Sequence, residues 1–350
     1  MLREAKLTLI AGARRAGVLE RIHQSAWRRD RLLILCYHGV SLEDEHNWRS
    51  SLYMSPLVFR SRMDTLKWYG CKVLPLAEAL IRLYRRDLPP RSVAITFDDG
   101  FYDFVRVVAP ILHEYQYPAT VYLTTYYVTR QLPVFPLVCS YMLWNRRSIV
   151  WNTNGAFGLT PTVDLATSRQ RSVVMKTILD WSDRRDLSAT DKDGLARSVA
   201  QTLGFDYDTL LHRRLLHLMN PLEVADLSGP GSGISFELHT HRHRTPADPD
   251  LFTAEIRQNR AIILETTGVE PSHFCYPSGV HRPELCELLE REKVLSATTC
   301  ELGLASCCEN QFLLPRLLDH MAVTSSEFEA WISGFGALLA RRPTYAGMSR

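Results

Sequence analysis

The sequence has little of what marks exported, membrane-spanning or nucleic-acid-binding proteins. Its eight cysteines include one adjacent pair and no C-x-x-C motif, a distribution that excludes a dense disulfide framework and fits reduced cytosolic thiols. No apolar run approaches the ~18 residues of a membrane span, and no signal-peptide pattern is present. The net charge of +3 over 350 residues is too mild for a dedicated nucleic-acid binder. We therefore expect a cytoplasmic globular protein without a nucleic-acid partner.

The N-terminal segment, residues 1–30, is basic. Counted through Arg31, it carries eight Lys or Arg against three Asp or Glu. We predict a solvated docking helix here. Peripheral contact of this helix with anionic membrane lipid is left open as the alternative. The sequence indicates no oligomeric state.

The next hundred residues alternate between short apolar runs and helical patterns. Strands are predicted over 32–37, 93–97 and 119–123, and helices over 56–70, 76–84 and 102–116. This β-α-β order predicts a mostly parallel sheet with helices packed outside it. In such sheets, reactive groups gather at the carboxyl ends of the strands.

From about residue 135 to 230 the pattern becomes predominantly helical, which we interpret as an insertion. Helices are predicted over 173–181, 195–203 and 210–219, with another beginning after the capping residue Asn220. Strands and helices then resume, with strands at 234–238, 273–276 and 294–299 and a helix at about 250–266.

Two adjacent carboxylates, Asp98 and Asp99, end the apolar strand in VAITFDDG. Like charges this close repel, so something must offset the cost. A simple turn is one explanation, because Asp and Gly are common turn formers. A divalent cation is the other, with one carboxylate as ligand and its neighbour as base.

Three of the twelve histidines lie within five residues, at positions 239, 241 and 243, directly after a predicted strand. Imidazoles with a carboxylate suit Zn²⁺ or a similar ion and leave coordination positions for water and substrate. On a helical turn, His239 and His243 would face one ion and His241 would not. In an extended segment all three would line one side, and the choice of pair stays open.

Together these motifs resemble the polysaccharide deacetylases, also called the NodB-homology family or carbohydrate esterase family 4. Thr96–Gly100 resembles their TFDDG motif, and His239–His243 resembles their H-(S/T)-x-x-H motif. The similarity extends over about residues 32–130 and 225–320. The run LLILCYHGV is similar to a branch with an N-terminal YH strand that deacetylates poly-N-acetylglucosamine.

The resemblance implies an α/β fold, the irregular (β/α) barrel of this family, interrupted by the helical insertion. The barrel halves would then be residues 31–135 and 231–350, with the insertion at 136–230 between them. The family's activity implies a hydrolase that removes acetyl groups from an N-acetylated glycan.

The resemblance also implies roles for individual residues. Asp98 corresponds to the general base, while Asp99, His239 and His243 correspond to the ligands of a divalent metal, expected to be Zn²⁺. A carboxylate on the ion is neutralised, and its neighbour stays free to take a proton from water. For the general acid, His38 at the end of its strand is favoured over His320, which fits the family's L-x-H motif.

The family's third motif is altered in this chain. Its arginine, which orients the base, is replaced by Cys275, which we interpret as a small core residue. Arg316 is the candidate to reach Asp98 from another strand instead. A backbone N–H near Ser278 is the expected oxyanion donor.

The favoured function is therefore metal-dependent N-deacetylation of a sugar in a polysaccharide or glycan precursor. Two alternatives are an amidohydrolase acting on a small non-sugar amide and a carbohydrate-binding protein with a degenerate site.

Overall fold

A curled, mostly parallel β-sheet forms the centre of the protein. A computed structural model describes residues 2–340. The strand order is β11-β10-β9-β6-β5-β1-β12, and only the β1–β12 pair is antiparallel. The strands are β1 (Arg31–Tyr37), β5 (Ser92–Asp99), β6 (Ala119–Leu123), β9 (Ile234–Leu238), β10 (His273–Cys275), β11 (Ser296–Thr298) and β12 (Ala305–Ser306). The α/β class predicted from the sequence is confirmed.

A C-terminal segment links the two sides of this sheet. Leu314 forms a parallel bridge with Thr298 of β11, and β13 (Leu317–Leu318) pairs in parallel with β1. A further short strand, β4 (Lys72–Val73), pairs with β5. The sheet therefore curls into the irregular barrel that the family resemblance implied.

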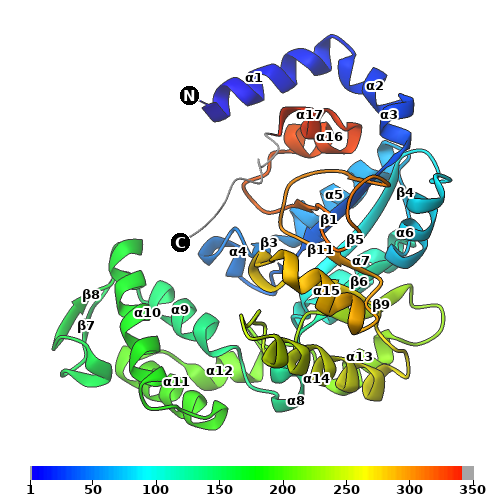
Figure 1. Ribbon diagram of the computed structural model, residues 1–350. Helices are drawn as coiled ribbons and strands as arrows, with labels where there is room; N and C mark the ends of the chain where they lie inside the picture. The colour runs from blue at the N-terminus through cyan, green and yellow to red at the C-terminus, as the bar shows by residue number, and fades with distance from the viewer. Residues whose placement is uncertain (1, 341–350) are drawn as a thin grey trace.

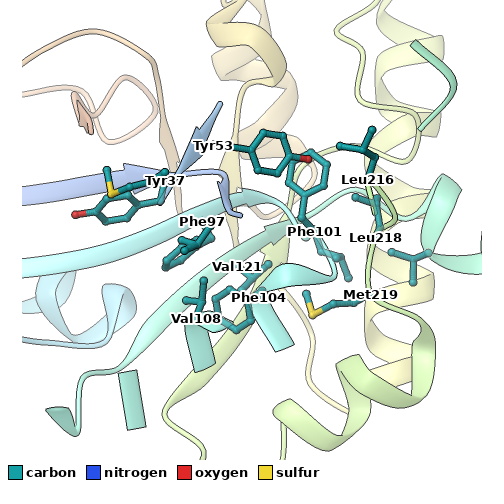
Figure 2. Close-up of a cluster of buried hydrophobic side chains, with 14 of the residues drawn as sticks. Tyr37, Tyr53, Phe97, Phe101, Phe104, Val108, Val121, Leu216, Leu218 and Met219 are labelled. Carbon is teal, nitrogen blue, oxygen red and sulfur yellow. The ribbon is translucent and has the colours of Figure 1, made fainter. Parts of the chain in front are cut away.

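Alternate residues of the strands face opposite sides of the curled sheet. In β1, Leu33 and Leu35 belong to the large core between sheet and helices, whereas Leu32 and Ile34 belong to a smaller cluster on the other side. This is the two-residue period of a strand that is buried on both faces. Figure 2 shows the large core around Phe97 of β5.

Helices that connect the strands cover the outside of the sheet (Figure 1). Ser55 caps the first of them by accepting a hydrogen bond from the N–H of Val58, and Gly70 follows its end with φ +62°. These helices are α5 (Pro56–Trp68), α6 (Leu76–Arg85), α7 (Ala109–Tyr115), α13 (Pro221–Leu227), α14 (Pro249–Thr267) and α15 (Pro283–Arg291).

The helix predicted over 102–116 forms, but its first part has π-helical rather than α-helical hydrogen bonding. The segment begins with a π-helical turn, Phe104–Val108, and only then continues as α7. Pro110 has no N–H to donate to the carbonyl of residue 106, and its ring crowds that carbonyl. The helical ladder therefore changes its register just before the proline.

Between β6 and β9 the chain is mainly helical and forms a lobe beside the barrel (Figure 1). The elements of this region are α8 (Tyr126–Arg130), α9 (Phe135–Asn145), β7 (Val150–Asn152), β8 (Thr162–Asp164), α10 (Ser168–Asp183), α11 (Ala189–Leu203) and α12 (Tyr207–His212). β7 and β8 pair as an antiparallel two-stranded sheet. The division of the chain into an insertion and two barrel halves stays a prediction.

The helix predicted over 210–219 ends early, at His212. Arg214 and Leu216 adopt left-handed φ values of 54° and 60°, which a right-handed helix cannot contain. The chain then runs back to the barrel, where Leu218 bridges to Phe101 (Figure 2).

Both ends of the described chain lie together at one side of the barrel (Figure 1). α1 (Leu2–Arg15) and α2 (Val18–His23) contact α16 (Ser325–Ser333), and the buried Arg28 donates a hydrogen bond to the carbonyl of Ile332 at 2.9 Å. The other terminal helices are α3 (Ala26–Arg29) and α17 (Phe335–Leu339). Within residues 2–340, no helix has the length and apolar character needed to cross a bilayer.

Candidate active site

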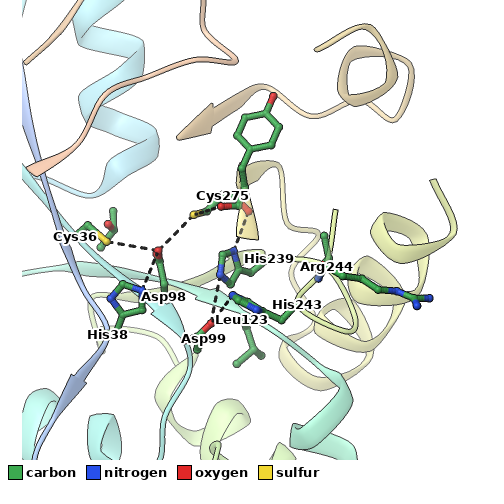
Figure 3. A network of polar contacts seen from close by, with 12 residues as sticks. Cys36, His38, Asp98, Asp99, Leu123, His239, His243, Arg244 and Cys275 are labelled. Atoms are coloured by element: carbon green, nitrogen blue, oxygen red, sulfur yellow. Dashed lines mark hydrogen bonds and ion pairs between the residues drawn. The ribbon is translucent and has the colours of Figure 1, made fainter. Parts of the chain in front are cut away.

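The candidate residues meet at the carboxyl ends of three parallel strands, β1, β5 and β9, with β6 lying between β5 and β9. Asp98 and Asp99 end β5, His38 follows β1, and His239 follows β9. Parallel pairing places all of these strand ends at one edge of the sheet, although the residues span two hundred positions of sequence. Figure 3 shows their side chains converging.

Asp99, His239 and His243 form a compact set of potential metal ligands. The Oδ1 atom of Asp99 lies 3.4 Å from Nε2 of His239 and 3.3 Å from Nε2 of His243. The potential ligand atoms all lie within 4.8 Å of one another. Burial alone would raise the pKa of Asp99, but the two imidazoles, above all His243, lower it to about 2.

One buried atom of this set accepts no hydrogen bond within the described chain. The buried Oδ1 of Asp99 accepts no hydrogen bond from any residue between 2 and 340. A buried carboxylate oxygen without a partner is costly, and a cation held between the carboxylate and the two imidazoles would remove that cost. One oxygen and two imidazole nitrogens also suit Zn²⁺ and similar ions. The residues present therefore fit a divalent metal.

The two aspartates have different surroundings because they are consecutive residues and the backbone turns at Asp99, the last residue of β5. Asp98 shares the sheet face of Ala94, inside the barrel, whereas Asp99 adopts a left-handed φ of 73°. Left-handed backbone is uncommon for a residue other than Gly, and it turns the second carboxylate away from the first. The turn and the metal-ligand explanations of DDG are therefore compatible.

The histidine segment is a loop and neither a helical turn nor an extended strand. Thr240 and His243 have left-handed φ values of 62° and 51°. His241 is directed elsewhere, since its Nδ1 lies 2.9 Å from Oγ1 of Thr125 and its ring packs on Tyr126. The loop conformation thus selects His239 and His243 as the pair facing Asp99.

Asp98 is held by Arg316 in a bidentate ion pair. The two N–O distances are 2.7 Å and 2.8 Å, and the Arg316 side chain is fully buried. Arg316 also donates to the carbonyl of Thr299 at 3.0 Å. Burial by itself would raise the pKa of Asp98, but the guanidinium holds it well below its usual range. The expectation that Arg316 reaches Asp98 is confirmed.

Cys275 lies beside this ion pair. Its Sγ is 3.1 Å from the guanidinium of Arg316 and 3.5 Å from Oδ2 of Asp98. Asp98, His239 and Cys275 also lie close enough to be considered as metal ligands. However, the guanidinium already occupies the space between Asp98 and Cys275, and its charge would repel a second cation there. The set around Asp99 is the better metal site.

His38 lies close to Asp98, and His320 does not contact the site. Nε2 of His38 is 3.9 Å from Oδ2 of Asp98, and the side chain is 24% exposed, so substrate can reach it. In the part of the chain that the structure describes, no hydrogen bond or ion pair joins His320 to Asp98 or Asp99; its Nδ1 accepts from the N–H of Ala322.

The loop that carries His38 is supported by two residues that the sequence did not reveal. The N–H of Val40 donates to Oδ1 of the buried Asp103 at 2.9 Å. Gly39 passes so close to Tyr53 that a Cβ atom would lie 2.3 Å from the ring. Cys36 was also missed, and its thiol lies 3.5 Å from Oδ2 of Asp98.

Comparison with known proteins bears on the family and on the fold. The family model described as polysaccharide deacetylase matches residues 85–147 and 221–294. No curated protein matches the chain.

Several solved structures share the fold. The Streptococcus pyogenes deacetylase PplD, in complex with acetate, is 19% identical with a TM-score of 0.52, covering 87% of this chain and 98% of that one. IcaB from Ammonifex degensii is 17% identical with a TM-score of 0.52, covering 87% and 97%. The de-N-acetylase from Aggregatibacter actinomycetemcomitans is 13% identical with a TM-score of 0.53, covering 85% and 98%. At these identities the likeness bears on the fold alone.

The protein thus combines a curled, mostly parallel sheet of the deacetylase barrel type with carboxylates and histidines at its strand ends. The chain is similar to the polysaccharide deacetylase family over the two matched segments, and members of that family hydrolyse carbon–nitrogen bonds other than peptide bonds.

Proposed function

We propose that this protein is a metal-dependent N-deacetylase that hydrolyses the acetamide of an N-acetylated sugar in a polysaccharide or glycan precursor. The observation that carries the proposal is the buried Oδ1 of Asp99, which accepts no hydrogen bond from residues 2–340 and lies 3.4 Å and 3.3 Å from Nε2 of His239 and of His243, beside an Asp98 held by Arg316. A divalent ion, expected to be Zn²⁺, would be held by Asp99, His239 and His243. When bound, it would polarise the acetamide carbonyl and acidify water.

Asp98 is the proposed general base. Arg316 fixes both of its oxygens and keeps it deprotonated at neutral pH, so Asp98 enters the reaction ready to accept a proton from the attacking water. Since Asp98 does not share the ligand set around Asp99, its proton-accepting role does not compete with metal binding.

His38 is the proposed general acid. Hydrolysis of the acetamide ends with departure of the sugar amine, which needs a proton as the C–N bond breaks. The partly exposed imidazole of His38 stands beside Asp98 on the β1 side, opposite the histidine loop that follows β9 (Figure 3). A proton acceptor and a proton donor are thus available at the same edge of the sheet. The backbone N–H near Ser278 stays the predicted oxyanion donor.

The proposal is tested by metal analysis and acetate release. Wild type, Asp98→Asn and His239→Ala are assayed on N-acetylglucosamine oligomers and, in parallel, on small non-sugar acetamides. We expect metal in wild type and Asp98→Asn, and acetate release from the oligomers only by wild type.

Three results would contradict the proposal. Full activity of Asp98→Asn would refute the assignment of Asp98 as the general base. Turnover restricted to small amides would favour a non-sugar amidohydrolase. Binding of the oligomers without any turnover would favour a carbohydrate-binding protein. The cytoplasmic location and the membrane contact of the N-terminal helix stay predictions.

A further inference from the structure

The loop that carries His239 and His243 is anchored to helix α14 by two buried polar side chains. Glu255 is 1% exposed and Asn259 is fully buried. Because they are four residues apart on the helix, they project from the same face. Buried polar groups are retained where each of them finds hydrogen-bond partners. Here those partners are in or next to the histidine loop.

Glu255 binds the second half of the loop. Its Oε2 accepts the backbone N–H of Arg242 at 2.7 Å, and its Oε1 accepts from the side chains of Arg242 at 3.3 Å and Arg244 at 2.7 Å. These two arginines are the immediate neighbours of His243 in the sequence. One buried carboxylate therefore fixes the backbone before His243 and the side chain after it.

Asn259 binds the first half of the loop. Its Oδ1 accepts the backbone N–H of His239 at 2.9 Å. Its Nδ2 donates to the carbonyl of Leu123 at 2.9 Å and to Oγ1 of Thr125 at 3.1 Å. The same Thr125 hydroxyl contacts Nδ1 of His241. Asn259 thus ties the histidine loop to the end of β6, the strand next to β5 and its aspartates.

We propose that Glu255 and Asn259 are positioning residues that set the spacing of His239 and His243 for metal binding. The proposal rests on the proposed metal site. Left-handed backbone at Thr240 and His243 persists only where the surroundings impose it. The hydrogen bonds from α14 hold the residues next to these two positions, His239, Arg242 and Arg244. Loss of either residue should leave the ligands present but misplaced, which weakens metal binding without removing a ligand.

The test measures metal affinity in protein freed of metal by a chelator and titrated with Zn²⁺ against a chromophoric competitor. The variants are Glu255→Gln and Asn259→Ala, with Glu265→Gln as the matched control, because Glu265 is exposed on the same helix. Removal of residues that orient metal ligands typically costs tenfold to a hundredfold in affinity. We expect losses of about this size in the two variants and none in the control.

A readout beyond stability separates positioning from general destabilisation. Saturating Zn²⁺ should restore much of the acetate release of Glu255→Gln but none of that of Asp98→Asn. The thermal midpoint of each metal-free variant is recorded in parallel. Should Glu255→Gln fail to fold, Arg244→Gln replaces it, because the Arg244 side chain is 53% exposed and its loss removes one contact of Glu255. A measurable loss of Zn²⁺ affinity is then expected in Arg244→Gln.

His243→Ala distinguishes failure of this proposal from failure of the proposed function. Wild-type affinity in His243→Ala would mean that the metal site itself is wrong. Loss of affinity in His243→Ala together with wild-type affinity in Glu255→Gln (or Arg244→Gln) and Asn259→Ala would overturn the positioning proposal and leave the metal site standing.

Discussion

Arg316 and Asp98, 218 residues apart in the sequence, form a bidentate ion pair inside the barrel with N–O distances of 2.7 Å and 2.8 Å. The guanidinium reaches Asp98 past Cys275, which occupies the place where the family pattern has an arginine. A carboxylate at the end of one strand is thus oriented by a cation from the segment that links the sheet's two sides.

Loss of Arg316 should destabilise the fold strongly. Arg316→Met would leave Asp98 buried without its counter-charge, and breaking one side of a buried pair costs about 3–5 kcal/mol in the free energy of unfolding. Urea denaturation of wild type and Arg316→Met measures this loss in the free energy of unfolding. In a double-mutant cycle, Arg316→Met with Asp98→Asn should cost less than the sum of the single variants. Strict additivity would argue that the two residues do not interact.

The two histidine variants His243→Ala and His241→Ala should differ in metal content. His243→Ala removes an imidazole from the set around Asp99, so its activity should fall to that of chelator-treated wild type. His241→Ala breaks the contacts with Thr125 and Tyr126, neither of which involves the set around Asp99, and should retain metal. Elemental analysis after dialysis compares them, and metal loss in both to the same degree would speak against the assigned pair.

Turnover should depend on His38 far more than on His320. A general acid contributes about 10²- to 10⁴-fold, so kcat of His38→Ala should fall within that range while its metal content is unchanged. His320→Ala is the control, because Nδ1 of His320 accepts a hydrogen bond from the N–H of Ala322, away from Asp98. The reverse order of the two kcat values would move the acid role to His320.

Stability should fall in acid because of His273. Burial lowers the pKa of His273 from 6.5 to about 4, so the folded state binds its proton less readily than the unfolded chain does. The free energy of unfolding should therefore decline as pH falls from 6.5 to 4, by about 3 kcal/mol from this group. Urea titrations across this window should show a shallower decline for His273→Asn. The exposed His113→Asn should follow wild type.

Gly39→Ala should disturb the loop that carries His38. A Cβ at Gly39 would lie 2.3 Å from the Tyr53 ring, and relieving such an overlap costs about 1–3 kcal/mol. We expect lower stability and lower kcat with metal retained. Gly12→Ala, where nothing lies within 4 Å of the added Cβ, is the matched control. Wild-type kcat in Gly39→Ala would show that this close approach does not position His38.

Much of the fold could be predicted because local patterns decide it. The predicted strands 119–123 and 234–238 have the bounds of β6 and β9, and Ser55 caps α5 as expected. Short apolar runs favour buried strands, and capping residues act on their nearest neighbours. The helix predicted over 102–116 is present, but the prediction did not specify that Phe104–Val108 is π-helical, although Pro110 carried the signal.

The roles of Glu255 and Asn259 could have been suspected from the sequence. The two polar residues are four apart in a helix that must bury one face against the sheet. This spacing indicates that the buried face forms hydrogen bonds with its neighbours. Their partners could not be named, because the loop that they hold has left-handed residues other than glycine at Thr240 and His243, for which no local pattern exists.

The sequence by itself determined the strands, the helices and the chemical groups of the candidate site, since these depend on side-chain type and on spacing along the chain. Only the tertiary structure decided which groups meet. Strand pairing brought Asp98, Asp99, His38 and His239 to one edge, and the linking segment carried Arg316 to Asp98. The physical reason is that register and loop backbone geometry arise from packing and hydrogen bonds between distant segments, which no short stretch of sequence contains.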